Sequence, residues 1–167
     1  ANAPAAVTPE QAAVWSYPLT DGDEEETIFN MVNAMLLRIH QSGHLVNLSP
    51  ARFALVKEAI ACYKSIRQDI RRAVPFWPLG LSSYGDSWIS LGLKAGNKNY
   101  IAVWRSDSGN DTCLLPISHL RGKDASVKCL YPQNAACRCA WHKESGELAV
   151  ELPVNISARL FEVSANE

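Results

Sequence analysis

The stretch SPARFALVKEAIACYKSIRQDIRRAVPFWPLGL, residues 49–81, decides how the rest of the chain is interpreted. Ser49 is a favourable helix N-cap, and Pro50 suits the first helical position because its missing N–H has no intrahelical partner there. Apolar side chains then recur every three or four residues; they are Phe53, Val56, Ile60, Tyr63, Ile66 and Ile70. Pro75 and Pro78 stop the helix. The stretch therefore predicts a long amphipathic helix that ends at a junction between two architectures.

The segment before this helix predicts another helix and one short strand. An acidic run at residues 21–26 marks a helix start, with an aspartate as N-cap and the glutamates near the positive end of the helix dipole. Apolar spacing carries this helix through Ile39, and Gly43 is expected to end it. Residues 42–48 then have room for one strand or a tight connection. This order is that of a βα unit. We expect the two helices to need a sheet that this chain does not contain.

The chain after Phe76 consists of short β-branched and aromatic runs separated by turns. The expected strands are residues 88–93, 100–105, 112–117, 126–131, 137–141, 147–152 and 158–163. Their spacing of roughly 8–12 residues predicts an antiparallel β-sandwich. The apolar side chains of Leu148 and Val150 alternate with Glu147 and Glu151, as expected for a sheet with one wet face.

Composition excludes several classes of function. The chain has 167 residues, 47% of them hydrophobic, and a formal net charge of -1. This balance argues against a nucleic-acid partner, and without an apolar run of roughly 18–20 residues a membrane partner is not expected either. Five cysteines at irregular spacing do not form a disulfide framework. The compartment stays open between the cytoplasm and secretion.

A cysteine cluster raises the question of a metal. Cys129, Cys137, Cys139 and His142 are four candidate zinc ligands. However, Cys137 and Cys139 fall in an expected strand, and the C-x-x-C pairs of a zinc ribbon are missing. We therefore expect no metal and no cofactor. Buried thiols, or a disulfide from Cys129 to one of the other two cysteines, are the favoured interpretations.

Several motifs together resemble a known family. They are WSYPLTDGDEEETIFNMVNAMLLRIHQSGHL (15–45), LSPARFALVKEAIACYKSIRQDI (48–70), PFWPLGL (75–81) and YIAVWR (100–105). In this order they resemble the C-terminal part of glycoside hydrolase family 36, the α-galactosidases and their relatives. The resemblance implies an α+β chain. Residues 1–74 would form the terminal βα units of a (β/α)8 barrel, with two helices, and residues 75–167 an antiparallel β-sandwich domain.

The resemblance also implies a function for the intact enzyme. Family members are retaining hydrolases of terminal α-linked galactosides in carbohydrate catabolism, with a nucleophilic aspartate in a Lys-x-Asp motif and a second aspartate as acid/base. The barrel-like part of this chain lacks Lys-x-Asp, so no catalytic residue is carried over and enzyme activity of this chain is uncertain. The chain would give structural support, and its partner would be the missing N-terminal part of the barrel. The substrate of the intact enzyme would be a galactoside. The exposed apolar stripes of the chain would also favour self-association. The alternative is a stand-alone carbohydrate-binding or accessory β-sandwich module.

Two residues are candidates for substrate binding, because groups that reach the substrate of a barrel enzyme lie on the loops after its strands. Trp15 could stack on the C–H face of a sugar, although a Trp beside Tyr and Pro is also typical of simple packing. His44 could contact substrate, although a structural histidine is the plainer interpretation. The other tryptophans could form a sugar platform or, as favoured here, the sandwich core; they are Trp77, Trp88, Trp104 and Trp141.

Overall fold

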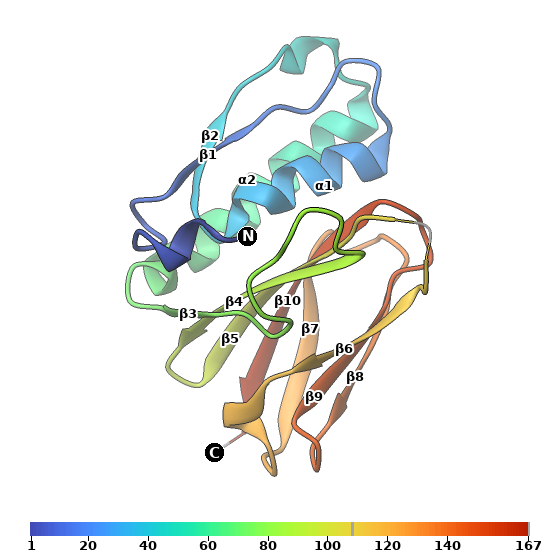
Figure 1. The fold of residues 1–167 in the computed structure, drawn as a ribbon. Helices are drawn as coiled ribbons and strands as arrows, with labels where there is room; N and C mark the ends of the chain where they lie inside the picture. Colours follow the sequence, from blue (N-terminus) through green and yellow to red (C-terminus); the bar gives the residue numbers. More distant parts are fainter. Residues whose placement is uncertain (108, 167) are drawn as a thin grey trace.

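A computed structural model describes residues 1–107 and 109–166 (Figure 1). The N-terminal part contains β1 (Ala13–Ser16), α1 (Glu24–Met35), β2 (Arg38–Gln41) and α2 (Pro50–Ile70). The strands that follow are β3 (Val74–Phe76), β4 (Trp88–Ala95), β5 (Lys98–Arg105), β6 (Thr112–Pro116), β7 (Ala125–Tyr131), β8 (Arg138–His142), β9 (Glu147–Glu151) and β10 (Ser157–Ala165). Short 3-10 turns lie at Ala3–Ala5, Leu45–Asn47 and Ser118–Leu120. None of the helices in the described ranges is both long and apolar enough to cross a membrane.

Two antiparallel sheets face each other and form a β-sandwich-like arrangement. The larger sheet has the strand order β3-β4-β5-β10-β7, and the smaller one β6-β9-β8. A closed apolar core lies between them, and its fully buried members include Ile101, Val103, Leu115, Leu148, Phe161 and Val163. All seven strands predicted from the sequence are present, so this expectation is confirmed.

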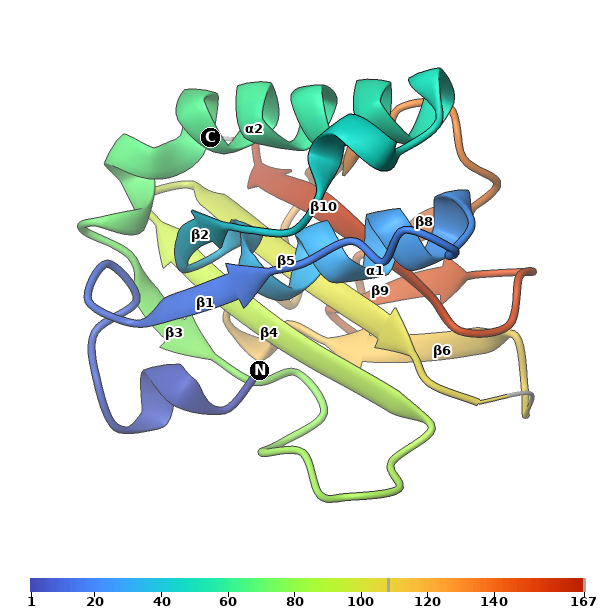
Figure 2. The ribbon, with the colours of Figure 1, turned by 90° about the horizontal axis from the view of Figure 1, so that it is seen from above.

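The two helices lie on the opposite face of the five-stranded sheet (Figures 1 and 2). A second core joins α1 and α2 to side chains of that sheet; the sheet contributes Leu91, Leu93, Tyr100, Ala102, Trp104, Tyr131, Ala158 and Leu160. On β10, Leu160 belongs to this core while its neighbour Phe161 belongs to the sandwich core. A central strand that is apolar on both faces can carry a layer on each side. The expectation that both helices need a sheet from outside the chain is therefore wrong.

The first helix is shorter than the sequence predicted. α1 ends at Met35, residues 38–41 form β2, and residues 42–48 hold a 3-10 turn rather than a strand. The cause is that Ile39 fits two periods, because it continues the helical stripe but also alternates with the exposed Arg38 and His40. Pairing with β1 decides between them. β1 and β2 run parallel, with Val14 opposite Ile39 and Trp15 opposite His40.

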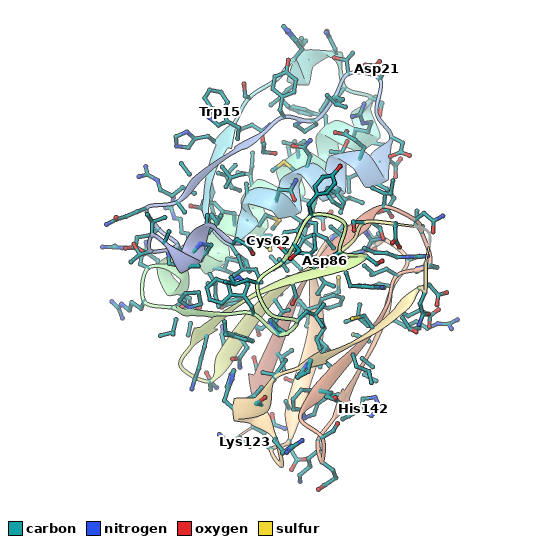
Figure 3. All side chains as sticks on the ribbon, in the orientation of Figure 1. Trp15, Asp21, Cys62, Asp86, Lys123 and His142 are labelled. Carbon is teal, nitrogen blue, oxygen red and sulfur yellow. The ribbon has the colours of Figure 1, made fainter. Side chains whose placement is uncertain are left out.

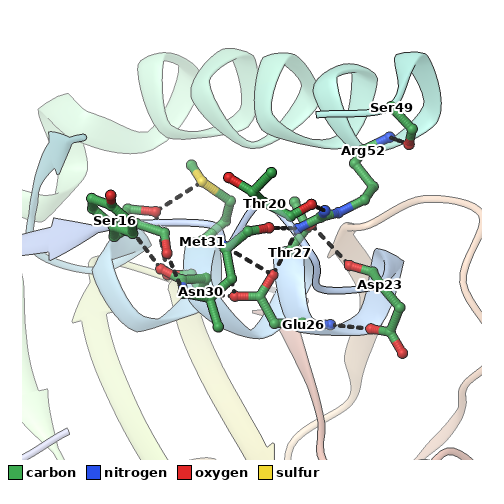
Figure 4. Close-up of polar contacts among 11 residues, drawn as sticks. Ser16, Thr20, Asp23, Glu26, Thr27, Asn30, Met31, Ser49 and Arg52 are labelled. Carbon is green, nitrogen blue, oxygen red and sulfur yellow. Dashed lines mark hydrogen bonds and ion pairs between the residues drawn. The ribbon is translucent and has the colours of Figure 1, made fainter. Parts of the chain in front are cut away.

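The predicted helix starts are confirmed. The Asp23 side chain accepts a hydrogen bond from Glu26 N at 2.8 Å, and Ser49 Oγ accepts one from Arg52 N at 3.3 Å (Figure 4). The buried face of α2 differs in detail from the predicted stripe. Phe53 is 41% exposed, and the adjacent Arg52 is buried in its place. This exchange matters for the loop that α2 supports.

Polar contacts also fasten the helices to the sheet. The guanidinium of Arg159, on β10, donates to both carboxylate oxygens of Glu25, at 2.8 and 2.7 Å. Tyr100 Oη donates to Asp69 Oδ2 at 2.6 Å, which ties β5 to the end of α2. The side chain of Arg159 is fully buried and that of Glu25 is 18% exposed. Such pairs fix the relative position of the layers because a lone buried charge is costly.

Candidate functional site

The β1–β2 pair brings two loops and an exposed face to one edge of the molecule. Because the strands are parallel, their carboxyl ends lie at the same edge. The loop at residues 17–23 follows β1, and the loop at residues 42–49 follows β2. α1 contacts this pair on one side and the five-stranded sheet on the other. The opposite face of the pair is turned away from the sandwich (Figure 1).

The two faces of this pair differ sharply in burial. Toward α1, Val14 and Ile39 pack on the helical core, and the fully buried Ser16 donates from Oγ to Met31 Sδ at 3.0 Å. On the other face, Trp15 is 69% exposed and points outward (Figure 3). Its ring meets that of His40 edge-on, with the centroids 6.3 Å apart. Trp15 is therefore not held by core packing. A sugar contact by Trp15 stays a prediction.

The loop after β1 is held firmly by α1 and α2 (Figure 4). Arg52 donates from Nε to Thr27 Oγ1 at 2.8 Å, from Nη1 to Thr20 O at 2.9 Å, and from Nη2 to Leu19 O and to Glu26 Oε2, the last at 2.9 Å. The side chain of Arg52 is 6% exposed. The bonds from Arg52 to Leu19 and Thr20 hold this loop in one position relative to the β1–β2 face.

Asn30 holds Tyr17, the first residue of this loop. Asn30 Oδ1 accepts from Tyr17 N at 2.7 Å, and Asn30 Nδ2 donates to Tyr17 O at 3.0 Å. The Tyr17 side chain is 44% exposed. It lies close to Gly43 of the second loop, where a Cβ would sit 3.5 Å from Tyr17 Cγ. Gly43 also has φ +90, a conformation that side chains disfavour. The two loops therefore approach each other at this edge.

The second candidate, His44, lies beyond the end of β2 and is therefore not paired with Trp15 in the β1–β2 register. His44 is exposed and directly precedes the 3-10 turn Leu45–Asn47, with no side-chain capping bond. The residue that the structure places against Trp15 is His40. Sequence reasoning missed His40 because it assigned residue 40 to the last turn of a helix. The alternation of apolar and polar residues from 37 to 40 was the signal that identifies it as a strand residue.

Three carboxylates near this edge are engaged in structural contacts. Asp23 caps α1, Glu25 pairs with Arg159, and Glu26 pairs with Arg52. Over residues 1–107 and 109–166, no three His, Cys, Asp or Glu side chains are grouped to hold a metal ion. The tryptophans outside β1 are at least partly packed: Trp104 is buried, and the indole N–H groups of Trp77, Trp88 and Trp141 donate to backbone carbonyls.

An exposed aromatic side chain should be dispensable for folding. We expect Trp15→Ala to change the free energy of unfolding by no more than about 0.5 kcal/mol, because Trp15 is 69% exposed. Urea denaturation followed by circular dichroism measures this. The matched replacement Trp104→Ala, at a side chain only 4% exposed, should cost about 3–5 kcal/mol. A loss at Trp15 close to that at Trp104 would show that Trp15 is a packing residue.

Comparisons with known proteins find similarity at the level of structure. No family model matches the chain, and no curated protein matches it by sequence. Solved structures of glycoside hydrolases share its fold at 10–14% sequence identity. They include a putative α-N-acetylgalactosaminidase of Bacillus halodurans (TM-score 0.60, covering 87% of this chain and 33% of its own) and an α-amylase of Geobacillus thermoleovorans solved with acarbose (TM-score 0.59, covering 86% and 34%).

Within this class, family 36 α-galactosidases match over most of the chain. The enzyme AgaA of Geobacillus stearothermophilus, solved with raffinose, has a TM-score of 0.63 at 14% identity. The galactosidase domain of the α-galactosidase–sucrose kinase AgaSK has a TM-score of 0.65 at 14% identity. Each match covers 93% of this chain but only 22% of the chain in the matched structure. The resemblance predicted from the motifs is thus confirmed at the level of fold, and the chain spans about a fifth of these α-galactosidases.

Proposed function

We propose that this chain is the C-terminal part of a retaining α-galactosidase-like glycoside hydrolase. Residues 1–74 would supply the last two βα units of its (β/α)8 barrel, and residues 75–167 its C-terminal sandwich domain. The observation that carries the proposal is the β1–α1–β2–α2 succession, in which a parallel strand pair exposes one face.

The open strand pair supports this proposal on physical grounds. Parallel strands are normally buried on both faces and paired at their edges. Here, within the described residues, β1 and β2 pair only with each other. Neighbouring barrel strands would cover both edges and enclose the face that carries Trp15. Without them, the same open edges favour self-association of the chain.

In that setting the chain would contribute to substrate binding. Substrates of such barrels bind at the carboxyl ends of the strands. The outer face of the pair would line the barrel interior, so Trp15 would offer an aromatic surface to the C–H face of a galactoside, and His40 would hold and extend this surface. His44 would lie on the rim, in the loop after β2. The loop fixed by Arg52 would keep the rim in place.

Catalysis would come from the rest of the barrel. Retention needs two carboxyl groups about 5–5.5 Å apart, one as nucleophile and one as acid/base. Asp23, Glu25 and Glu26, three carboxylates beside this face, serve as a cap and as ion-pair partners instead. We therefore assign the chain a supporting role and place the aspartate pair on earlier barrel strands.

The test compares the chain alone with a longer polypeptide encoded by the same reading frame. The chain alone should not hydrolyse a chromogenic α-galactoside. The coding sequence upstream of Ala1 should carry a Lys-x-Asp motif and a second aspartate, and its product should hydrolyse that substrate. In this product, Trp15→Ala should lower kcat/KM by about 10- to 100-fold, the loss of one aromatic stacking contact. Turnover by the chain alone, or no effect of Trp15→Ala, would contradict the proposal.

The accessory-module alternative makes a different prediction for the chain alone. A stand-alone sugar-binding module should show a saturable change in tryptophan fluorescence on titration with raffinose, and Trp15→Ala should remove it. We expect no saturable change, because one strand pair offers a single wall rather than an enclosed site.

A further inference from the structure

A small pocket lies at the amino ends of β1 and β2, away from the loops that follow these strands. The turn before β1, the start of β2 and the C-terminal part of α2 meet there, on one side of the molecule (Figures 1 and 2). The pocket has a volume of about 240 Å³, and the buried Ile70 forms part of its wall. Pockets for drug-sized molecules begin at about 300 Å³, so this one suits a smaller ligand.

Three arginines from two different elements line this pocket, which we call the arginine pocket. Arg38 is the first residue of β2, and Arg67 and Arg71 lie one helical turn apart at the end of α2. All three side chains are exposed. The ion pairs found among residues 1–107 and 109–166 use other cations. Within that part of the chain, the three positive charges therefore face one space without an ion-pair partner.

The nearby carboxylates do not neutralise this group. Glu10 is the only carboxylate in the lining among the described residues, and its Oε1 accepts from Thr8 Oγ1 at 2.8 Å. Asp69, between Arg67 and Arg71 in the sequence, accepts instead from Tyr100 Oη at 2.6 Å. Three guanidinium groups and one carboxylate give the lining a net charge of +2. A phosphate monoester carries about −1.5 to −2 at pH 7, so the two charges are complementary.

The helix dipole alone does not account for this arrangement. Cations near a helix C-terminus complement its negative end, which would explain Arg67 and Arg71. Arg38 comes from β2 instead, where its backbone N donates to Ala12 O at 2.9 Å. Tyr63 and Gln68 also line the pocket and can supply uncharged donors. Because the planar guanidinium can bind two phosphate oxygens at once, donors from a strand and a helix around one space suit a tetrahedral anion.

We propose that the arginine pocket binds a phosphate group, either as inorganic phosphate or as the monoester of a small metabolite. Arg38 binds the group from the side of β2, and Arg67 and Arg71 bind it from the side of α2. The bound anion would link the start of the strand pair to the end of the helix that packs behind it. Trp15 and the loops after β1 and β2 take no part, so the inference does not depend on the proposed hydrolase function.

The first experiment is an NMR titration of the ¹⁵N-labelled chain, whose mass is 18.4 kDa. Inorganic phosphate and glycerol 3-phosphate are added separately, with the ionic strength held constant by sodium chloride. We expect saturable amide shifts at residue 38 and residues 67–71, with a Kd on the order of 1 mM. Tighter binding of glycerol 3-phosphate would identify the monoester as the ligand, and equal or weaker binding would identify free phosphate. The absence of saturable shifts at these residues with both ligands would overturn the proposal.

The second experiment repeats the titration on variants. Arg38→Gln and Arg67→Gln should each raise the Kd at least about 10-fold, because each removes charge-assisted hydrogen bonds to the phosphate. The matched control is Arg72→Gln, which changes the net charge equally at an exposed residue outside the lining. It should raise the Kd no more than about 2-fold, because salt screens exposed charges that do not touch the ligand.

The same spectra report whether each variant is folded. All three substitutions are at exposed positions, so the dispersion of the amide signals should be retained. An equal loss of affinity in Arg72→Gln and Arg67→Gln would indicate a diffuse positive field instead of a site. That result, or an unchanged Kd in Arg38→Gln, would contradict the assignment.

Discussion

Replacing Arg52 with methionine is expected to lower the free energy of unfolding by about 3–5 kcal/mol. Methionine keeps much of the side-chain volume but removes every donor. Glu26 would lose its cation, and the carbonyls of Leu19 and Thr20 would lose the guanidinium that now binds them. Leaving an acceptor or a charge buried without a partner is the main cost. Urea denaturation monitored by circular dichroism gives the value.

The matched control for this substitution is Arg71→Met. Arg71 is the exposed C-cap residue at the other end of α2, so its loss should change stability by no more than about 0.5 kcal/mol. If Arg52→Met cost as little as Arg71→Met, the loop after β1 would not depend on α2. The positions of Trp15 and Tyr17 at the proposed site would then lack the support described above.

The second large effect is expected from Leu160→Ala, at about 2–5 kcal/mol. Leu160 is fully buried on β10, in the core that joins the helices to the five-stranded sheet. Truncation removes apolar contacts and leaves a cavity between the layers. The control is Leu114→Ala on β6, where the side chain is 53% exposed and the cost should stay below about 1 kcal/mol. Similar losses at the two sites would mean that the helices are not anchored on this sheet.

The local parts of the fold could be predicted because their causes are local. Ser49 and Pro50 define the start of α2, Asp23 that of α1, and alternation around Leu148 identifies β9. These features depend on residues within one helical turn or one strand. Strand spacing therefore predicted the sandwich strands, and the capping residues predicted both helix starts.

No local rule predicts which surface of the chain the two helices pack against. The run YIAVW at residues 100–104 is continuously apolar, which marks a strand buried on both faces. Its second face takes the helices, so the same chain supplies both partners of that contact. Sequence motifs alone placed these elements in separate domains, at residues 1–74 and 75–167. That boundary stays a prediction, while the core of the helical layer is shared with the five-stranded sheet.

The candidate site depends on the pairing of Trp15 with His40, which lie 25 positions apart in the sequence. Trp15 was identified because it is aromatic and lies before a helix. Its neighbour His40 becomes evident only when β1 and β2 are set in parallel register. That register comes from tertiary packing of Val14 and Ile39 on the helices, which the helical spacing of Ile39 concealed. His44 was preferred because the strand was expected after residue 41 rather than before it.

The most direct test of the central claim is hydrogen–deuterium exchange of the chain alone, resolved to peptides of β1, β2, β5 and β10. The claim is that the helical layer is anchored on the chain's own sheet, while the β1–β2 pair is open to strands from elsewhere. We expect β5 and β10 to exchange only through global unfolding, and β1 and β2 to exchange much faster through local opening. In the longer polypeptide, β1 and β2 should become protected as well. Protection of β1 and β2 equal to that of β5 and β10 in the chain alone would contradict the claim.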